Sequence, residues 1–413
     1  MTVFQLSAIV LTLAALFSYI NHRHIKLPTT IGVMLIAQVL SLVLLVVGAF
    51  VPQVSSMLRS FVIDLHFDDA LLEGMLGALL FAGALHINLG DLRKQAWPVA
   101  IFASVGVAIS TALIASIFMF VCSLLNITIS WIHALLFGAL ISPTDPIAVL
   151  GLLKKMKAPK WLETMIAGES LFNDGVGVVI FLALFEVAFE HHDFTAEFVL
   201  TLFVQEAIGG AIFGYVVGYA AYSLIKRVDN YQVEILLSLA TAIGGYAAAM
   251  ALHLSGPIAM VVAGLLLGNK GRYMGMSDET VSRLDHFWEL IDEILNVVLF
   301  LLLGLELLIL DLQRAYLILG AAMIVGVLLG RLISIQTLLL ILRRFRPYST
   351  GTGRILVWGG LRGGISVALA LSLPSSSGEV RDVLLTATYL VVTFSIVVQG
   401  LTISKLLHKI ELA

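Results

Sequence analysis

The sequence predicts an all-α membrane protein with about thirteen transmembrane helices. Three observations carry this prediction. First, 60% of the 413 residues are hydrophobic and only 12% are charged, whereas a soluble protein has about 25% charged residues. Second, apolar runs of about twenty residues recur along the chain, and each is long enough to cross a hydrocarbon core about 30 Å thick. Third, Lys and Arg residues gather in alternate loops.

The apolar runs define thirteen candidate spans. In order along the chain, they cover residues 3–20, 28–49, 69–87, 96–122, 131–152, 162–189, 197–225, 232–252, 255–268, 287–310, 316–342, 355–373 and 383–404. The ninth span is short, and the tenth begins with a polar amphipathic turn. The single cysteine, Cys122, excludes an intramolecular disulfide and a multi-cysteine metal site.

The basic residues test the number of spans. The loops after the odd-numbered spans, with the C-terminal end, contain nineteen of the 24 Lys and Arg residues: Arg23, Lys26, Arg93, Lys94, Lys154, Lys155, Lys157, Lys160, Lys226, Arg227, Lys270, Arg272, Arg283, Arg343, Arg344, Arg346, Arg354, Lys405 and Lys409. The other loops contain three: Arg59, Arg314 and Arg381. Cytoplasmic loops are enriched in Lys and Arg. We therefore expect an integral protein of the cell (inner) membrane, with the N-terminus outside and the C-terminus in the cytoplasm.

The fifth span contains an interruption. Its middle reads Ser142-Pro143-Thr144-Asp145-Pro146, and two prolines three residues apart should break the helix. Irregular backbone at membrane depth is tolerated where it is buried in protein or lines a watery cavity. Freed carbonyls, the Thr144 oxygens and the Asp145 carboxylate would suit a cation. A proline kink with a hydrogen-bonded Asp145 is the structural alternative.

The sixth span carries the run Glu169-Ser170-Leu171-Phe172-Asn173-Asp174-Gly175. Residues four apart share a helix face, so Ser170 and Asp174 line one stripe while Glu169 and Asn173 line the next. All four side chains bear oxygen, which suits a hard cation. The structural alternative is that arginines neutralise these acids purely for packing.

The twelfth span contains a second interruption. Four glycines flank Arg362 in the run Trp358-Gly359-Gly360-Leu361-Arg362-Gly363-Gly364, which weakens the helix and allows close backbone approach. Interruptions at corresponding places in two halves indicate an inverted-repeat transporter with a site near the midplane. Spans one to six and eight to thirteen would be the repeats, and spans five and twelve the interrupted, crossing helices.

Five charges inside the spans indicate the chemistry. Asp145, Glu169, Asp174, Arg331 and Arg362 together leave one net negative charge. An uncompensated carboxylate in a low-dielectric site favours protonation or a bound cation. A proton and a monovalent cation are then alternative ways to neutralise one site, as an exchanger requires. Three acids nearer the span ends, Glu206, Glu234 and Glu306, are expected at solvated or interfacial positions.

At these residues the chain resembles the NhaP-type sodium/proton antiporters of the monovalent cation:proton antiporter family, which are related to the eukaryotic sodium/hydrogen exchangers. The three runs quoted above, in this order and spacing, carry the resemblance. It implies a thirteen-helix inverted-repeat fold, a homodimer and an elevator-like movement of a core domain. By the same resemblance, residues 1–95 and 190–312 would form the dimerisation scaffold. Residues 96–189 and 313–413 would form the transport core.

The resemblance also implies roles for the site residues. Asp174 would carry the cation and the proton, with Asp145, Ser170 and Thr144 as supporting ligands of the transported Na⁺. In the supporting structure, Glu169 would pair with Arg331 beside Asn173, and Arg362 would balance the charge of the crossing helices. The Asn173-Asp174 pair resembles the electroneutral branch, in which one cation exchanges for one proton.

Two other functions remain as alternatives. A Na⁺-coupled symporter of an organic solute could use a similar fold, but it would need a solute pocket that spans five and twelve do not indicate. An intramembrane aspartyl protease could use Asp145 and Asp174, but it gives Arg331 and Arg362 no role. The sequence leaves the choice among Na⁺, Li⁺ and K⁺ open. We expect no enzymatic activity, no resident cofactor and no nucleic-acid partner.

Overall fold

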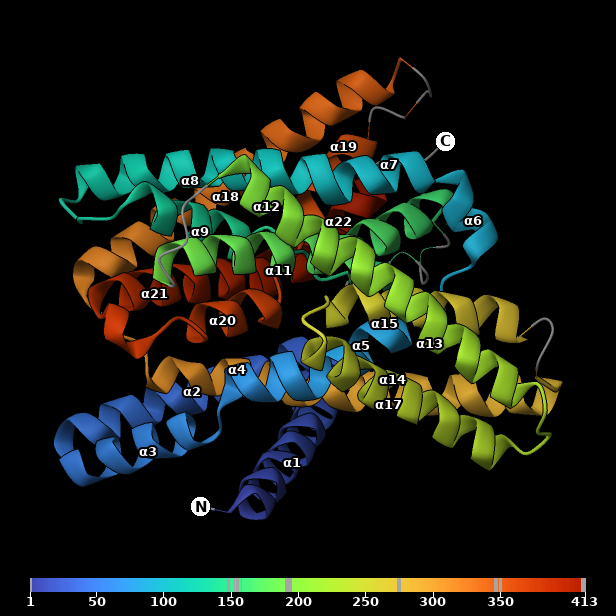
Figure 1. Ribbon diagram of the computed structural model, residues 1–413. Helices are drawn as coiled ribbons and strands as arrows, with labels where there is room; N and C mark the ends of the chain where they lie inside the picture. The colour runs from blue at the N-terminus through green and yellow to red at the C-terminus, as the bar shows by residue number, and fades with distance from the viewer. Residues whose placement is uncertain are drawn as a thin grey trace.

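The computed structural model describes residues 2–146, 149–151, 153, 156, 158–189, 195–272, 276–344, 348 and 351–409. Within these residues the regular secondary structure is helical, apart from one isolated bridge between Asp145 and Leu361 (Figure 1). Eight of the described helical segments are long and apolar enough to cross a membrane, and two shorter apolar helices accompany them. The predicted all-α membrane fold is therefore confirmed.

The first part of the chain runs through α11, and the segments labelled η within this part are short π-helices. Its elements are α1 (Val3–Ile20), η1 (Asn21–Ile25), α2 (Thr29–Phe50), α3 (Pro52–Asp64), α4 (Phe67–Asp69), η2 (Ala70–Met75), α5 (Leu76–Leu85), α6 (Leu89–Lys94), α7 (Ala96–Ile101), η3 (Phe102–Gly106), α8 (Val107–Leu124), α9 (Trp131–Leu140) and α11 (Lys160–Phe189). Residues 149–151 are also helical. Residues 147, 148 and 152 beside them lie outside the described part of the chain.

The second part of the chain contains the second interruption, and two of its segments labelled η, Glu306–Leu308 and Ser375–Ser377, are 3₁₀ helices. Its elements are α12 (Ala196–Phe203), η4 (Val204–Ile208), α13 (Gly209–Ile225), α14 (Tyr231–Ala251), α15 (Gly256–Leu266), η5 (Leu267–Gly271), α17 (Asp278–Leu305), η6 (Glu306–Leu308), α18 (Arg314–Leu342), α19 (Thr352–Trp358), α20 (Gly364–Leu371), η7 (Ser375–Ser377), α21 (Glu379–Phe394), η8 (Ser395–Gln399) and α22 (Gly400–Lys409).

Each of the thirteen predicted spans coincides with a helix, a run of consecutive helical segments or an interrupted helix. Two differences are informative. An unpredicted amphipathic helix, α3, begins directly after the second span, because Pro52 at its first turn suits a helix start. The helix of the tenth span begins at Asp278 instead of residue 287. There the Ser277 side chain accepts a hydrogen bond from the Thr280 backbone N–H and caps the helix.

The helices form two groups in Figure 1. The upper group contains α7–α9, α11 and α18–α22, and the lower group contains α1–α5, α14, α15 and α17. Within the upper group α8 packs against α9 and α18, and α18 packs against α21. Within the lower group α17 packs along α2, and α15 packs against α5; α15 also packs against α13, which belongs to neither group. The two groups meet where α11 contacts α15 and α5 and where α17 contacts α20.

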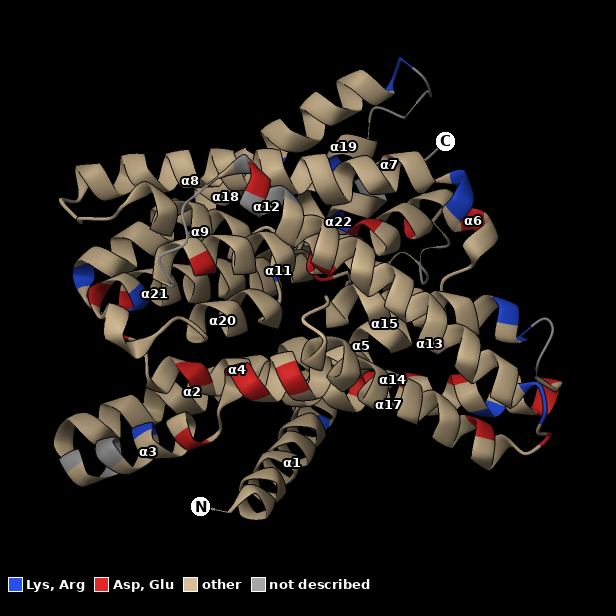
Figure 2. Cartoon of the chain, viewed as in Figure 1, with Lys and Arg blue, Asp and Glu red and all other residues tan. Residues whose placement is uncertain are grey.

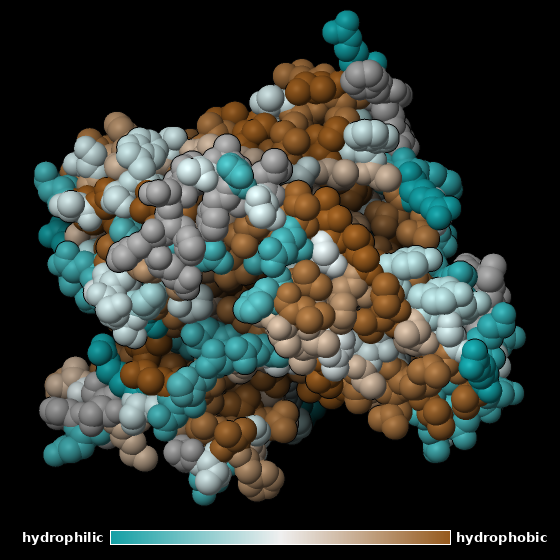
Figure 3. Space-filling view, viewed as in Figure 1, coloured by the Kyte–Doolittle hydropathy of each residue, from teal (hydrophilic) through white to brown (hydrophobic). Residues whose placement is uncertain are grey.

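Charge and hydropathy are unevenly distributed over the molecule. Figure 2 shows Lys and Arg gathered toward one end of the helices, at α6 and near the ends of α13 and α17. Figure 3 shows hydrophobic residues over much of the same face, with hydrophilic residues at its left and right edges and also across its middle. The basic residues Lys154, Lys155, Lys157 and Arg346, which supported the predicted alternation of loops, lie outside the described residues.

The two interrupted helices cross at their breaks. The first interruption follows α9 and has no helix from residue 142 to residue 146, and the second separates α19 from α20. The Asp145 backbone N–H donates a 2.8 Å hydrogen bond to the Leu361 carbonyl, which joins the two breaks as an antiparallel bridge. This close approach depends on glycine, because a Cβ atom at Gly363 would lie 2.9 Å from the Asp145 Cβ atom.

One expectation about the acids near the span ends is wrong. Glu234 and Glu306 are buried, with 1% and 2% of their surfaces exposed, instead of solvated. Glu234 lies in the first turn of α14, where its carboxylate accepts a 3.2 Å hydrogen bond from the Asn230 backbone N–H. A carboxylate at a helix N-terminus satisfies a backbone donor that has no partner within the helix. Glu206, by contrast, is partly exposed.

Candidate ion-binding site

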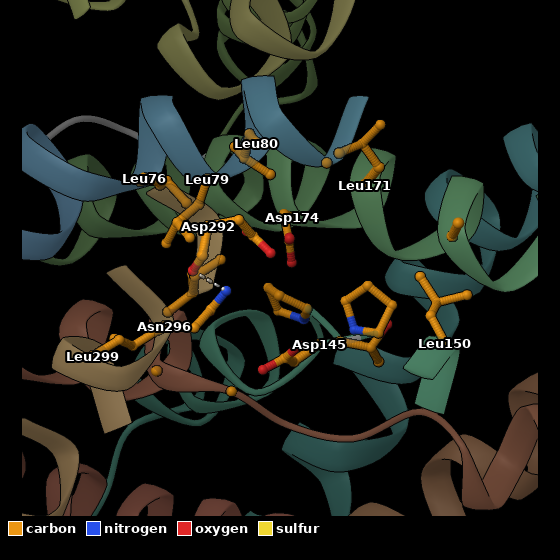
Figure 4. Close-up of a pocket in the computed structure, with 18 of the residues that line it drawn as sticks. Leu76, Leu79, Leu80, Asp145, Leu150, Leu171, Asp174, Asp292, Asn296 and Leu299 are labelled. Carbon is orange, nitrogen blue, oxygen red and sulfur yellow. Dashed lines mark hydrogen bonds between the residues drawn. The ribbon is translucent and has the colours of Figure 1, made fainter. Parts of the chain in front are cut away.

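A cavity of about 310 Å³ lies beside the crossing of the two interrupted helices. Its polar lining includes three carboxylates and one amide, which Figure 4 shows around a common space. These side chains belong to Asp145, Asp174, Asp292 and Asn296. Leucines of α5, α11 and α17 form much of the remaining wall, and no Lys or Arg lines the cavity within the described residues.

Asp174 lies in the middle of α11, and only 7% of its surface is exposed. Its position four residues after Ser170 places it on the helix stripe that faces the first interruption, as predicted. The carboxylate of Asp145 is near enough to Asp174 for like-charge repulsion. Two carboxylates beside one apolar-walled cavity require a proton or a cation to neutralise them.

Thr144 is held in place by two side chains of α11. The Asn173 Nδ2 donates a 2.8 Å hydrogen bond to the Thr144 Oγ1, and the Thr144 backbone N–H reaches the Asn173 Oδ1 at 3.3 Å. The Ser170 hydroxyl donates to the Thr144 carbonyl, and the two hydroxyl oxygens lie 2.9 Å apart. The backbone of the first interruption is therefore hydrogen-bonded by the helix that carries Asp174.

Arg362 supplies donors where the prolines remove them. In a continuous helix the Ser142 carbonyl would accept from residue 146, but Pro146 has no backbone N–H. The Arg362 Nη1 instead donates to the Ser142 carbonyl at 2.5 Å and to the Pro143 carbonyl at 3.1 Å. The guanidinium is buried, with 2% of the residue exposed, so these bonds replace solvation that the site does not offer.

Arg331 and Glu169 form the predicted contact. The Arg331 Nη1 lies 2.6 Å from the Glu169 Oε1, and both side chains are at most 9% exposed. Arg331 also donates a 3.2 Å hydrogen bond to the Leu356 carbonyl of α19. A Cβ atom at Gly360 would lie 2.7 Å from the Arg331 Nε, so the glycine of the second interruption makes room for the guanidinium.

The structure thus divides the predicted site residues into two sets. Asp174, Asp145 and Thr144 line the cavity, whereas Ser170 and Asn173 lie behind Thr144 and outside the lining. Glu169, Arg331 and Arg362 also lie outside the lining, at the backbone that supports it.

Two cavity residues were missed by the sequence analysis, Asp292 and Asn296 of α17. Asp292 lies in the polar start of the tenth span, which contains several acids. The sequence alone did not distinguish it from the acids that are exposed to solvent. A signal was present, because Leu284 and Trp288 are fully buried and residues 292 and 296 continue the same spacing of four. That spacing places Asp292 on the packed face of the helix.

Comparisons with known proteins agree with this geometry. Residues 10–409 match the family described as "Sodium/hydrogen exchanger, transmembrane". The chain is 49% identical to the Na⁺/H⁺ antiporter NhaP of Pseudomonas aeruginosa over 411 residues, which cover 98% of this chain and 96% of the relative. It is 35% identical to the Na⁺/H⁺ antiporter NhaH of Halobacillus dabanensis over 390 residues, covering 94% and 93%.

A solved structure shares the fold. The sodium proton antiporter MjNhaP1 of Methanocaldococcus jannaschii superposes with a TM-score of 0.76 over 97% of each chain, at 17% sequence identity. The resemblance stated from the three sequence runs is therefore confirmed over the length of the membrane region. The chain belongs to the family of transmembrane sodium/hydrogen exchangers.

Proposed function

We propose that this protein exchanges a monovalent cation, Na⁺ with Li⁺ or K⁺ as alternatives, for a proton across the membrane. One observation carries the proposal: buried Asp174 and partly buried Asp145 line the same cavity, and no Lys or Arg lines it within the described residues. The relatives named above are Na⁺/H⁺ antiporters, and their membership of the same family supports this function. Nothing observed favours the solute symporter.

Asp174 is the residue at which the two ions compete. A carboxylate with little access to water is neutralised either by a proton or by a bound cation. The Thr144 oxygens and Asp145 lie on the opposing backbone and supply further hard oxygen ligands. Arrival of Na⁺ releases the proton from Asp174, and departure of Na⁺ allows the proton to return.

The exchange is electroneutral in this proposal. Position 173, next to Asp174, is an asparagine and supplies no second carboxylate. Both polar atoms of its amide are hydrogen-bonded to Thr144. Glu169 is engaged with Arg331 and does not line the cavity. One carboxylate on α11 then carries one proton in one direction and one monovalent cation in the other.

The site must become accessible from each side of the membrane in turn. In this proposal a transport core moves relative to a scaffold, as the resemblance implies. Residues 96–189 and 313–413 form the transport core, and residues 1–95 and 190–312 form the scaffold and a homodimer contact within the lipid bilayer. The packing of α8, α9 and α18 in one group and of α2, α15 and α17 in the other supports this division. Movement of one group past the other would carry Asp174 across the barrier.

The orientation is proposed from the placement of charge. Lys and Arg gather at the end of the molecule that contains α6 (Figure 2), which we assign to the cytoplasm. The N-terminus then lies outside and the C-terminus in the cytoplasm of the cell (inner) membrane. The cavity lining reaches His86 at the end of α5, next to α6, so the cavity faces the cytoplasmic side.

The test is ion exchange by the purified protein in proteoliposomes that contain a pH-sensitive dye. Addition of Na⁺, Li⁺ or K⁺ on one side should move protons the opposite way without any organic solute. The three cations, added separately, report the selectivity. An unchanged dye signal with all three cations, from folded protein, would overturn the proposed function.

A further inference from the structure

Asp292 and Asn296 approach the cavity from a different part of the molecule than the other polar residues. Asp145 and Asp174 belong to the first interruption and to α11, whereas Asp292 and Asn296 project from α17 (Figure 4). α17 packs along α2 and also contacts α1 and α14. The cavity therefore has oxygen ligands on both of its sides, one set in each helix group.

Asn296 carries a polar atom that has no partner in the described part of the protein. The residue is 2% exposed and lines the cavity. Its Nδ2 donates a 2.8 Å hydrogen bond to the Asp292 carbonyl, but its Oδ1 accepts none. Buried polar atoms are nearly always satisfied, so an unsatisfied acceptor that faces a cavity indicates a missing donor or cation.

The chemistry of this pair suits a monovalent cation. Asp292 and Asn296 are four residues apart and share one helix face, which brings a carboxylate and an amide oxygen to the same stretch of wall. Oxygen ligands are those that hard cations prefer, and water can complete the coordination in a cavity of about 310 Å³. Asp145 is near enough to Asp292 for like-charge repulsion, which a bound cation would relieve.

We propose that Asp292 and Asn296 form a second cation position, fixed to the scaffold, which holds the entering Na⁺ before it reaches Asp174. This inference rests on the proposed function of the cavity as the transport route. Because α17 belongs to the lower helix group, the position does not travel with Asp174. It raises the local cation concentration beside the transport site. It therefore affects the binding of the entering Na⁺ and not the later movement of the site across the membrane.

The first experiment measures the KM for Na⁺ and the maximal exchange rate of Asp292→Asn in proteoliposomes. The KM should rise about tenfold, because a charged cleft raises local ion concentration by that order or more. The maximal rate should stay within about twofold, since capture no longer limits exchange at saturating Na⁺. The matched control is Glu293→Gln, which removes one negative charge from an exposed neighbour on the same helix and should leave both values unchanged.

The second experiment detects the position directly by Na⁺ titration calorimetry on protein that cannot exchange. Asp174→Asn should retain one weak Na⁺ site, and the double variant Asp174→Asn with Asp292→Asn should lose it. If Asp292→Asn does not fold, Asn296→Leu removes the orphaned amide oxygen at similar volume and should raise the KM in the same direction.

The inference is overturned if folded Asp292→Asn exchanges Na⁺ with a KM within about twofold of the wild type. It is also overturned if the KM is unchanged while the maximal rate falls, because that split would assign Asp292 to translocation. These outcomes are distinct from failure of the proposed function, in which the wild-type protein itself would show no cation-dependent proton movement.

Discussion

The two interrupted helices meet at one point but are built from opposite chemistry. The first break uses Pro143 and Pro146, which remove backbone donors and leave carbonyls without partners. The second uses glycines, which leave space, and it carries Arg362, whose guanidinium donates to the Ser142 and Pro143 carbonyls of the first break. The first break therefore presents Asp145 and Thr144 to the cavity, while the second supplies what makes the first stable. One break lines the cavity with polar groups and the other supports its backbone.

The largest expected effect is at the carboxylate that faces the first break. Asp174→Asn keeps the shape of the side chain and removes its charge, so the protein should fold and should not exchange ions. The measurement is Na⁺-dependent proton movement in proteoliposomes, with a thermal melt to confirm folding. Exchange at near wild-type rates by this variant would transfer the carrier role to Asp145.

The wild-type protein should also show competition at this carboxylate. As pH falls, protons occupy the same site as Na⁺, so the KM for Na⁺ should rise, by up to about tenfold per pH unit under simple mass action. A series of Na⁺ titrations between acidic and alkaline pH measures this. A KM that stays constant while only the maximal rate changes would separate the proton site from the cation site.

The next effect is on the support of the second break. Arg331→Ala leaves Glu169 as an uncompensated buried charge, which typically costs about 3–5 kcal/mol of the free energy of unfolding. Thermal stability and expression should fall more than cation affinity changes. A variant that melts normally but no longer binds Na⁺ would assign Arg331 to the ion site instead.

A smaller loss is expected where the two breaks touch. Arg362→Gln keeps a side-chain amide that can donate to one of the two carbonyls, Ser142 or Pro143. The second of these carbonyls then has no donor. An unsatisfied buried polar group costs about 1–3 kcal/mol. The melting temperature should therefore fall less than in Arg331→Ala, and Arg362→Lys should recover part of the loss. Equal melting of Arg362→Gln and wild type would show that these carbonyls do not need the arginine.

The smallest expected effect is that of the membrane potential. A potential imposed with valinomycin and K⁺ should not drive Na⁺ uptake, because one Na⁺ replaces one proton at Asp174. Na⁺ flux at zero pH gradient reports this directly. Accumulation that follows the imposed potential would require an additional charge to move with the site, and Asp145, which belongs to the same helix group as Asp174, would be the first candidate.

Features that depend on local chemistry could be predicted from the sequence. Prolines and glycines interrupt a helix wherever the chain places them, so both breaks were found at their observed positions. The contact between Arg331 and Glu169 was also predicted, from the family resemblance, and it agrees with the need of a buried arginine for an acid.

Features that depend on tertiary packing could not be predicted in the same way. Asp292 was missed because its place at the cavity depends on which face of α17 meets the cavity, and Glu306 was misplaced because its burial depends on neighbouring helices. Ser170 stays predicted as an ion ligand, and its hydrogen bond to Thr144 was not foreseen because only the fold brings Thr144 within reach.

The bridge between the two breaks has a consequence for how this protein tolerates change. The Asp145 N–H and the Leu361 carbonyl belong to the main chain, so every residue except proline at position 145 can form the same hydrogen bond. Substitutions of the side chain at position 361 therefore leave the carbonyl that accepts this hydrogen bond in place. The contact between the two breaks therefore depends on the backbone, and side chains that line the cavity can change while this contact is kept.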